Sequence, residues 1–383
     1  MNVLFVCNNA YNPGNGLSVA ILTTIERLRQ LGVDARLMAV RNPDPDGPQP
    51  DFPLEHFIFP LFEPIIAANG FAFAKIDKRK INEAIEWADV VHLEEAMPLQ
   101  DAAIRIARKK NKACVSTFHL FPHNITANWG WPKKNFANPL IMKYMNGIVY
   151  NRCSDIHCPT LICKQYLMAK GTKARFHVIS NGIDLPSEPV VTKPYGDMSE
   201  IRLLCIGRLS NEKSQNTLMD AMRYSKYARK IRLIFAGNGP WADKYKKMAD
   251  KLYDDGVVSI RPEFGFFSHE ELAELARQCY LYIHCAWVEV EGLSCLEATR
   301  EGAVPVIGEG RHIGTPQFAI CPESIYPSGD SKALAERIDW WIEHPEERDR
   351  YSQAYADAAR RFSGDESIRQ MIQMYETALA DKR

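Results

Sequence analysis

The sequence lacks the features that would mark a membrane-spanning or a disulfide-framed protein. No stretch reaches the roughly 20 consecutive apolar residues that a membrane-spanning helix needs. The first residues carry no basic leader and run directly into the apolar segment Val3–Val6, so we expect no signal peptide. Ten cysteines are present, but no Cys-x-x-Cys pair occurs, and several cysteines lie within apolar segments. We therefore expect reduced thiols in the core of a cytoplasmic protein.

A metal site and a nucleic-acid surface are also disfavoured. Cys153, Cys158 and Cys163 are spaced five residues apart, which does not gather them on one helix face, so we expect no metal there. Lysine plus arginine and aspartate plus glutamate both number 47, which gives a formal net charge of zero. The sequence contains no recognised nucleic-acid motif, no internal repeat and no low-complexity tract.

The chain reads as two blocks of alternating strands and helices. The alternation runs from residue 2 to about residue 185 and restarts at Ile201. Between the blocks, residues 186–198 are rich in proline, serine, glycine and acidic residues. Because 383 residues exceed what one hydrophobic core usually serves, we expect two domains. The pattern predicts an α/β protein with two parallel sheets covered by helices, joined by a linker over residues 186–200.

The loop that begins at Glu289 is the most informative segment. The apolar run Leu281–Cys285 predicts a buried strand that leads into this loop, and a helix pattern begins near Leu293. Free N–H groups at a helix N-terminus attract phosphate, whereas Glu289 and Glu297 can accept hydrogen bonds from hydroxyl groups of a molecule attached to that phosphate. The alternative is that Glu291 and Glu297 are first-turn glutamates that only favour the helix dipole.

A second segment ends a predicted strand in Gly207 and carries Arg208 and Lys213, which suggests a diphosphate clamp. The alternative is a solvated turn with two cations. A third predicted strand ends in the turn Gly237–Pro240, which alone is weak support for a site.

Taken together, these segments resemble a retaining glycosyltransferase of family 4. The resemblance covers nearly the whole chain and rests on the order of a glycine loop near the N-terminus, Asp89–His92, Ser116–His119, Val178–Asp184, Gly207–Arg208, Gly237–Pro240 and the Glu289/Glu297 pair. It implies the GT-B architecture, in which two Rossmann-like domains face each other across a cleft. It also implies that the last helix crosses back, so that residues 1–185 and 363–383 form the acceptor domain and residues 201–362 the nucleotide-sugar domain.

The resemblance also implies a role for individual residues in a metal-independent reaction that needs no cofactor besides the nucleotide-sugar donor. His119, Arg208, Lys213 and Glu289 are the expected catalytic residues, of which His119 and Glu289 contact the donor sugar. The expected donor-binding residues are Gly16, Asn181, Gly207, Gly237, Asn238, Gly239, Phe264, Gly265, Phe266, Glu291, Gly292, Leu293, Ser294 and Glu297. Gly16 would let the backbone approach the diphosphate, because a Cβ there would obstruct it.

Phe118–Thr126 and Glu289–Glu297 further resemble bacterial glycosyltransferases that act on diacylglycerol. This implies a peripheral membrane enzyme, on the inner face of the cell membrane, that moves glucose from UDP-glucose to a lipid hydroxyl. Relatives of similar pattern extend polysaccharides, so a saccharide acceptor is the alternative. A non-catalytic sugar-nucleotide binding protein and a phosphorylase-like enzyme acting on a soluble sugar are the rivals.

The charge distribution supports a membrane contact. Residues 102–175 contain 13 basic side chains and one acidic side chain, Asp155. Within this span, bulky apolar groups alternate with cations, as in a segment that lies on an anionic membrane surface. The residues that we expect to contact the membrane or acceptor are Trp129, Trp131, Lys133, Lys134 and Phe136. The alternative is that the aromatic residues pack beneath a loop and that the cations are solvated.

Two positions depart from the usual family pattern. Glu291 stands where an aromatic residue is common, and Glu94 stands where a histidine is frequent. Both carboxylates are expected to bear on specificity.

Overall fold

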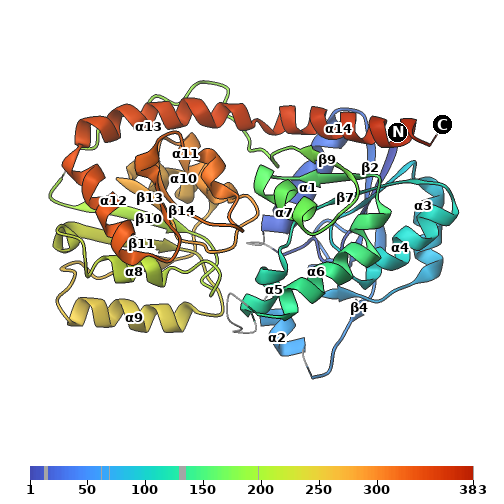
Figure 1. Cartoon of the computed structure of the whole chain (residues 1–383), viewed down its shortest axis with the longest axis horizontal. Coiled ribbons are helices and arrows are strands. Elements are labelled where there is room, and N and C mark those ends of the chain that lie inside the picture. Colours follow the sequence, from blue (N-terminus) through green and yellow to red (C-terminus); the bar gives the residue numbers. More distant parts are fainter. Residues whose placement is uncertain (13–15, 62, 69, 129–134, 197, 383) are drawn as a thin grey trace. The chain divides into compact units, whose positions relative to one another are not determined.

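The computed structural model describes the chain except residues 13–15, 62, 69, 129–134, 197 and 383. The described residues form two compact units, each with its own sheet and helices (Figure 1). Unit 1 comprises Met1–Gly182 and Gly364–Arg383, and unit 2 comprises Ile183–Ser363.

The sheet of unit 1 has seven parallel strands in the order β3-β2-β1-β6-β7-β8-β9. Most residues of these strands are buried, as expected for a parallel sheet that is covered on both faces. The strands are β1 (Asn2–Val6), β2 (Asp34–Val40), β3 (Phe52–Leu54), β6 (Val90–Leu93), β7 (Ala113–Thr117), β8 (Asp155–Cys158) and β9 (Arg175–Val178). A separate antiparallel pair joins β4 (His56–Phe57) to β5 (Phe73–Ala74).

The helices of unit 1 include one from the far end of the chain. The helices are α1 (Gly16–Gln30), α2 (Glu63–Ala68), α3 (Lys78–Trp87), α4 (Pro98–Lys109), α5 (Pro122–Asn128), α6 (Ala137–Ile148), η1 (Tyr150–Arg152), α7 (Leu161–Ala169) and α14 (Gly364–Ala380). Met371 and Tyr375 of α14 pack with Phe5 and Val115 of the sheet and with Ile25 of α1 in one buried cluster. The predicted return of the last helix to the first domain is therefore confirmed.

Unit 2 has a six-stranded parallel sheet in the order β12-β11-β10-β13-β14-β15. Its strands are β10 (Ile201–Ile206), β11 (Ile231–Ala236), β12 (Glu263–Gly265), β13 (Leu281–His284), β14 (Val304–Glu309) and β15 (Ile325–Pro327). Its helices are α8 (Asn216–Ala221), η2 (Ala228–Lys230), α9 (Ala242–Asp254), α10 (His269–Gln278), α11 (Leu293–Arg300), η3 (Thr315–Phe318), η4 (Pro322–Ser324), α12 (Ser331–Glu343), α13 (Pro345–Ala359) and η5 (Arg360–Phe362). The two predicted parallel sheets are thus confirmed.

Residues 186–200, the expected linker, fall within unit 2. The backbone N–H of Thr192 donates to Gln353 Oε1 at 3.0 Å, and that of Tyr195 donates to Asp349 Oδ1 at 3.2 Å. Both acceptors are on α13, so this segment is held against the second unit.

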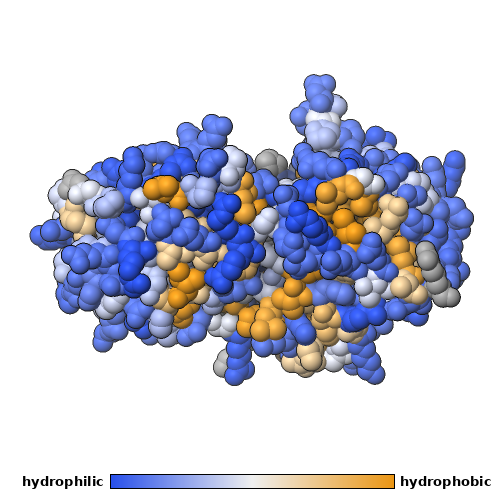
Figure 2. Space-filling view, turned by 90° about the horizontal axis from the view of Figure 1, so that it is seen from above, coloured by the Kyte–Doolittle hydropathy of each residue, from blue (hydrophilic) through white to orange (hydrophobic). Residues whose placement is uncertain are grey.

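All ten cysteines are buried as free thiols. Among the residues that the structure describes, no helix combines the length and the apolar character needed to cross a membrane. The same part of the chain contains no group of three or more His, Cys, Asp or Glu side chains arranged to hold a metal ion. On the face shown in Figure 2, hydrophilic residues cover most of each unit, and hydrophobic residues emerge between them in smaller groups.

Candidate active site

The first part of the site lies at the carboxyl ends of three neighbouring strands of unit 2. Gly207 follows β10, Gly237 follows β11, and Gly265 ends β12, so all three meet at one edge of the sheet, where ligands bind in open α/β sheets. The N–H of Gly237 donates to Gly265 O at 2.7 Å. Gly237 has φ +151°, and a Cβ there would lie 2.2 Å from Gly207 O. Only glycine fits between these two strand ends.

The turn after Gly237 packs on the backbone of the neighbouring loop. A Cβ on Gly239 would lie 2.4 Å from Leu209 O, and Asn238 O accepts from the N–H of Leu209 at 2.9 Å. The two predicted aromatic residues differ in exposure. Phe264 stacks on Phe235 of the core with ring centroids 4.9 Å apart, whereas Phe266 is 73% exposed. Of the two rings, that of Phe266 is the more accessible to solvent.

Glu289 is the centre of the site in unit 2. Lys213 Nζ donates to Glu289 Oε2, and His284 Nε2 lies 3.5 Å from the same oxygen. The ring of His284 also contacts Thr315 Oγ1 at 3.2 Å. Short backbone hydrogen bonds to the segment 312–314 hold the Glu289 backbone in place. The sequence patterns predicted Lys213 and Glu289 but missed His284 and Thr315.

The ionisation of this cluster follows from burial and charge. Burial by itself raises the pKa of the Glu289 carboxyl, but the Lys213 ammonium and the His284 ring outweigh it and lower the pKa to about 2. Burial lowers the pKa of His284. At pH 7 Glu289 is therefore a carboxylate and His284 a neutral imidazole.

The predicted helix start after this loop is confirmed. Gly292 precedes α11 with φ +88°, in the left-handed region, and provides no side chain to cap the helix. Consequently the first N–H groups of α11, on Leu293 and Ser294, face the loop without a side-chain cap, whereas the Ser294 hydroxyl contacts Tyr282 OH at 3.0 Å. An uncapped helix start of this kind attracts anions.

The two other glutamates of this segment differ in surroundings. Glu297 lies on α11, and burial raises the pKa of its carboxyl. Glu291, the departure from the family pattern, is buried.

Arg208 is held differently from Lys213. Its guanidinium donates to Glu212 Oε1, four residues along the chain. Glu212 is buried, and its Oε2 atom has no hydrogen-bond partner within the described part of the chain. The spacing of four residues next to Lys213 was the available signal for Glu212, but the sequence patterns did not single it out.

Unit 1 gathers its predicted residues at the carboxyl ends of its own strands. Glu94 follows β6, His119 follows β7, and Asn181 follows β9. His119 Nε2 lies 2.7 Å from Glu94 Oε2. All three residues line one cavity, and Ser180 and Thr24 line it as well.

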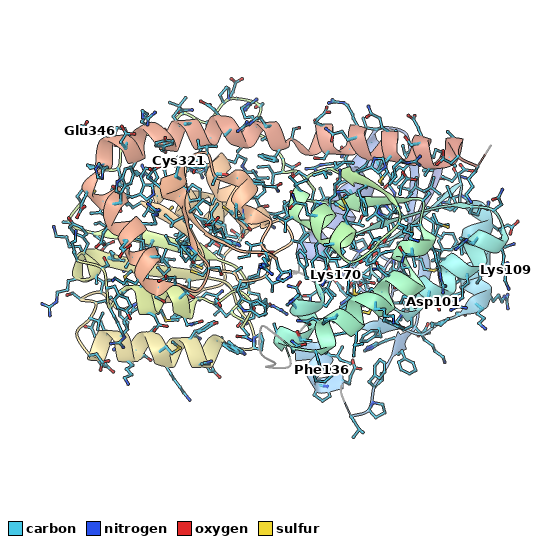
Figure 3. All side chains as sticks on the ribbon, in the orientation of Figure 1. Asp101, Lys109, Phe136, Lys170, Cys321 and Glu346 are labelled. Atoms are coloured by element: carbon cyan, nitrogen blue, oxygen red, sulfur yellow. The ribbon has the colours of Figure 1, made fainter. Side chains whose placement is uncertain are left out.

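The remaining predicted residues of unit 1 are less constrained. Gly16 begins α1 with open space around its Cβ position, so nothing in the described structure requires glycine there. Phe136 precedes α6 and is 77% exposed (Figure 3). Trp129, Trp131, Lys133 and Lys134 lie outside the described residues.

Comparisons with known proteins match both units. Residues 14–186 match the model of the Glycosyltransferase Family 4 domain, and residues 194–357 match that of the glycosyl transferases group 1. The alpha-monoglucosyldiacylglycerol synthase of Streptococcus pneumoniae is 25% identical over 269 residues, which cover 64% of this chain and 58% of that protein. The alignment thus spans less than two thirds of the relative's length.

Similar solved structures include one that spans nearly the whole chain and one that spans less than half of it. The Anabaena protein HepE, determined with UDP-glucose, matches with a TM-score of 0.72 and 18% identity over 98% of this chain and 100% of that chain. The catalytic domain of the cholesterol-alpha-glucosyltransferase of Helicobacter pylori is 39% identical over 43% of this chain and 99% of that chain, with a TM-score of 0.40. With family models matched over both units, the chain belongs to the family 4 type of glycosyltransferases and has the GT-B fold of two Rossmann-like units.

Proposed function

We propose that this protein is a retaining glycosyltransferase that moves a hexose, glucose in the first instance, from a UDP-sugar to a hydroxyl group of a membrane lipid such as diacylglycerol. The observation that carries the proposal is the convergence of Lys213 and His284 on Glu289, next to the uncapped start of α11. The glucose and the lipid acceptor are taken from the name of the Streptococcus pneumoniae relative and from the sequence resemblance.

The leaving nucleoside diphosphate gains negative charge as the glycosidic bond breaks, so electrostatic stabilisation is the main requirement. Lys213, Arg208 and the first N–H groups of α11 supply positive charge at one edge of the sheet. Lys213 pairs with Glu289, and Arg208 pairs with Glu212. We propose that, when the donor binds, its diphosphate accepts hydrogen bonds from these two cations.

The carboxylates have a separate role in the proposal. Because the pKa of Glu289 is about 2, its side chain is ionised at pH 7 and can only accept hydrogen bonds. It is proposed to hold hydroxyl groups of the donor sugar, while Glu297 accepts from the ribose. From unit 1, His119 and Asn181 are proposed to contact the sugar. We assign no covalent nucleophile, and the proton of the acceptor hydroxyl passes to the leaving phosphate in a front-side attack.

An exposed apolar face on α6 supports the lipid acceptor. Phe136, Leu140 and Tyr144 follow one another at intervals of four residues and are 77%, 60% and 52% exposed. Lys143 is exposed beside them. An apolar stripe with neighbouring cations suits the surface of an anionic membrane. We propose that this face, and the basic span 102–175 around it, contact the membrane.

Release of nucleoside diphosphate from UDP-, GDP- and ADP-sugars, with and without diacylglycerol in anionic liposomes, tests the proposal when products are identified by mass. We expect turnover of UDP-glucose that depends on the diacylglycerol. Turnover with a soluble saccharide alone would replace the lipid by a saccharide acceptor, and no turnover with any donor would favour a sugar-nucleotide binding protein.

The donor site is tested by Lys213→Met and Glu289→Gln. Each change leaves one partner of a partly buried ion pair without its counter-charge, so we expect a loss of transfer of about 100-fold or more, comparable to loss of a preorganised charge contact. The matched control is Lys226→Met, which breaks the exposed pair between Lys226 and Glu343. Full activity in either site variant would contradict the proposed donor site.

The membrane face is tested by the triple variant Phe136→Ser, Leu140→Ser and Tyr144→Ser. Binding to anionic liposomes in a sedimentation assay should fall, while turnover of UDP-glucose with a detergent-dispersed acceptor should persist. The control replaces Leu31 and Val191, which are exposed at other positions, by serine. Unchanged liposome binding in the triple variant would contradict the membrane role of α6.

A further inference from the structure

Three histidines at the ends of neighbouring strands in unit 1 differ in how their ring nitrogens are used. His92 lies in β6, His157 lies in β8, and His119 follows β7, the strand between them. All three line the same cavity. Among the described residues, both ring nitrogens of His92 and of His157 have hydrogen-bond partners, whereas only one ring nitrogen of His119 has one.

The proton positions on His157 and His92 follow from one another. His157 Nε2 lies 2.7 Å from Ile179 O, which can only accept, so this nitrogen carries the proton. Burial lowers the pKa of His157 and of His92, so both rings are neutral. His157 Nδ1 therefore accepts from the Thr117 hydroxyl at 3.0 Å.

The series of hydrogen bonds continues to the helix α14. Having donated to His157, the Thr117 hydroxyl accepts from His92 Nε2 at 2.7 Å. His92 Nδ1 then accepts from Tyr375 OH at 2.8 Å. Each ring nitrogen of these two histidines thus has a partner from the fold, and neither has a nitrogen left for a ligand.

His119 has one nitrogen left. Its Nε2 atom lies 2.7 Å from Glu94 Oε2, and Glu94 is 2% exposed. Across the described residues, His119 Nδ1 has no recorded hydrogen-bond partner, and its side chain lines the cavity together with Ser180 and Asn181. Among the three histidines, His119 alone can offer a nitrogen to a ligand in this cavity.

Glu94 determines the state of that nitrogen. Burial raises the pKa of the Glu94 carboxyl, but the imidazoles of His92 and His119 outweigh burial and lower it, so the group is ionised. A carboxylate can only accept, which requires that His119 Nε2 carries a proton and donates it. In the neutral ring, Nδ1 then carries a lone pair.

We propose that Glu94 is a positioning residue that fixes the Nε2–H tautomer of His119, so that Nδ1 accepts a hydrogen bond from one hydroxyl group of the donor hexose. This inference rests on the proposed function, because it takes the ligand of the cavity to be the transferred sugar. It explains why a carboxylate stands at position 94 of this chain: an amide could hold either tautomer.

The first test reads the tautomer directly in the free protein. Long-range ¹H–¹⁵N correlation spectra of histidine-labelled protein should show His119 protonated at Nε2, and Glu94→Gln should convert part or all of the signal to the Nδ1–H form. The matched control is Glu95→Gln, because Glu95 Oε2 accepts from Asn8 and Gln100 and does not contact His119. An Nδ1–H tautomer in the wild type would overturn the inference.

The second test links Glu94 to the sugar hydroxyl through turnover of a series of monodeoxy UDP-glucoses. In the wild type, one deoxy donor should lose about tenfold or more in kcat/KM relative to UDP-glucose, the loss expected for one buried hydrogen bond. Glu94→Gln should lower turnover of UDP-glucose, mainly in kcat, and should remove the penalty of that one deoxy donor. Glu95→Gln should keep it.

The two tests separate the inference from the proposed function. If the wild type turns over no UDP-sugar, the proposed function fails and the tautomer spectra still decide the role of Glu94 toward His119. If UDP-glucose is turned over and every deoxy penalty persists unchanged in Glu94→Gln, the inference fails while the proposed function stands.

Discussion

Some glycines of this protein lie where the fold leaves no room for a Cβ, and others lie where a Cβ would fit. Alanine substitutions distinguish the two kinds. Gly237 lies between two strand ends, where a Cβ would collide with Gly207 O at 2.2 Å. We expect Gly237→Ala to lower the free energy of unfolding of unit 2 by more than about 2 kcal/mol, because the clash involves backbone and cannot be relieved by a side-chain rotation. Urea unfolding followed by circular dichroism measures the change.

Gly16→Ala is the matched comparison. Because its Cβ position has open space among the described residues, we expect a change in unfolding free energy of less than about 0.5 kcal/mol. If Gly16 lets the backbone approach the diphosphate as the resemblance implies, the same variant should raise KM for the donor. An unchanged KM would mean that Gly16 has no role in donor binding.

Buried neutral histidines make the stability of unit 1 depend on pH. Burial lowers the pKa of His157 to about 3 in the folded protein, whereas the unfolded value is about 6.5. A depressed histidine pKa means that the unfolded chain binds more protons below pH 6.5, so stability falls as pH falls from about 6.5 toward 3. We expect His157 to contribute a loss of about 2 kcal/mol between pH 7 and pH 5.

The measurement is the difference in pH dependence between the wild type and His157→Gln, from urea unfolding at several pH values. Subtraction is needed because burial also raises the pKa of Glu95, which acts in the opposite direction as the pH falls. Parallel curves for the two proteins between pH 7 and pH 5 would contradict a buried neutral His157.

At the scale of elements, the start of α11 joins the fold to the proposed donor site. Gly292 has φ +88°, and a Cβ there would lie 2.5 Å from Thr315 Oγ1, the atom that contacts His284. Gly292→Ala should therefore displace Thr315 and the helix start together. We expect a several-fold higher KM for the donor and a loss of about 1–2 kcal/mol in unfolding free energy.

Gly302, just after the other end of α11, is the control. It has φ +87°, and its Cβ would lie 2.4 Å from Thr192 Cγ2, so Gly302→Ala imposes a similar strain away from Glu289. Its unfolding free energy should fall by a similar amount while KM for the donor stays unchanged. Equal changes of KM in both variants would indicate that the effect is general destabilisation.

Helices and strands could be predicted from the sequence where residues close together in the chain determine them. Apolar runs of four to six residues predicted strands such as β10, β11 and β13, because strands of a covered parallel sheet are buried on both faces. The start of α11 followed from the glycine loop and the helix periodicity. The pairing of Arg208 with Glu212 is also local, because only four residues separate the two positions.

Other parts of the site depended on distant residues and could not be predicted. The contact of Lys213 with Glu289 joins positions 76 residues apart, and that of His92 with Tyr375 joins positions 283 apart. No local pattern encodes such pairs, because the topology of the sheet brings them together. For the same reason Glu94 was noticed only as a departure from the family, and its contact with His119 came from the structure.

At the scale of the whole molecule, the two units differ in whether their residues are contiguous in the sequence. Unit 2 is one continuous segment, whereas unit 1 needs α14 to complete its core. A chain that ends after residue 363 loses Met371, Tyr375 and their neighbours from that core. We expect such a chain to retain a folded unit 2 and to lose the fold of unit 1, because uncovering one face of the sheet removes several large buried side chains.

Limited proteolysis with mass spectrometry distinguishes the outcomes of this truncation. Fragments within residues 183–363 should resist cleavage, and those within residues 1–182 should be degraded. A chain that ends after Asp381 keeps α14 and should behave like the 383-residue chain. A protease-resistant unit 1 in the shorter chain would contradict the structural role of α14.

The position of α14 also has a consequence for biosynthesis. A ribosome completes residues 183–363 before it makes the helix that covers the sheet of residues 1–182. Unit 2 can therefore fold first, while one face of the unit 1 sheet is still uncovered. During that interval, the apolar face that will receive Met371 and Tyr375 is open to chaperones and to aggregation. A nascent chain therefore acquires its His119 cavity, which α14 helps to line, only after the proposed donor-binding unit has already been synthesised.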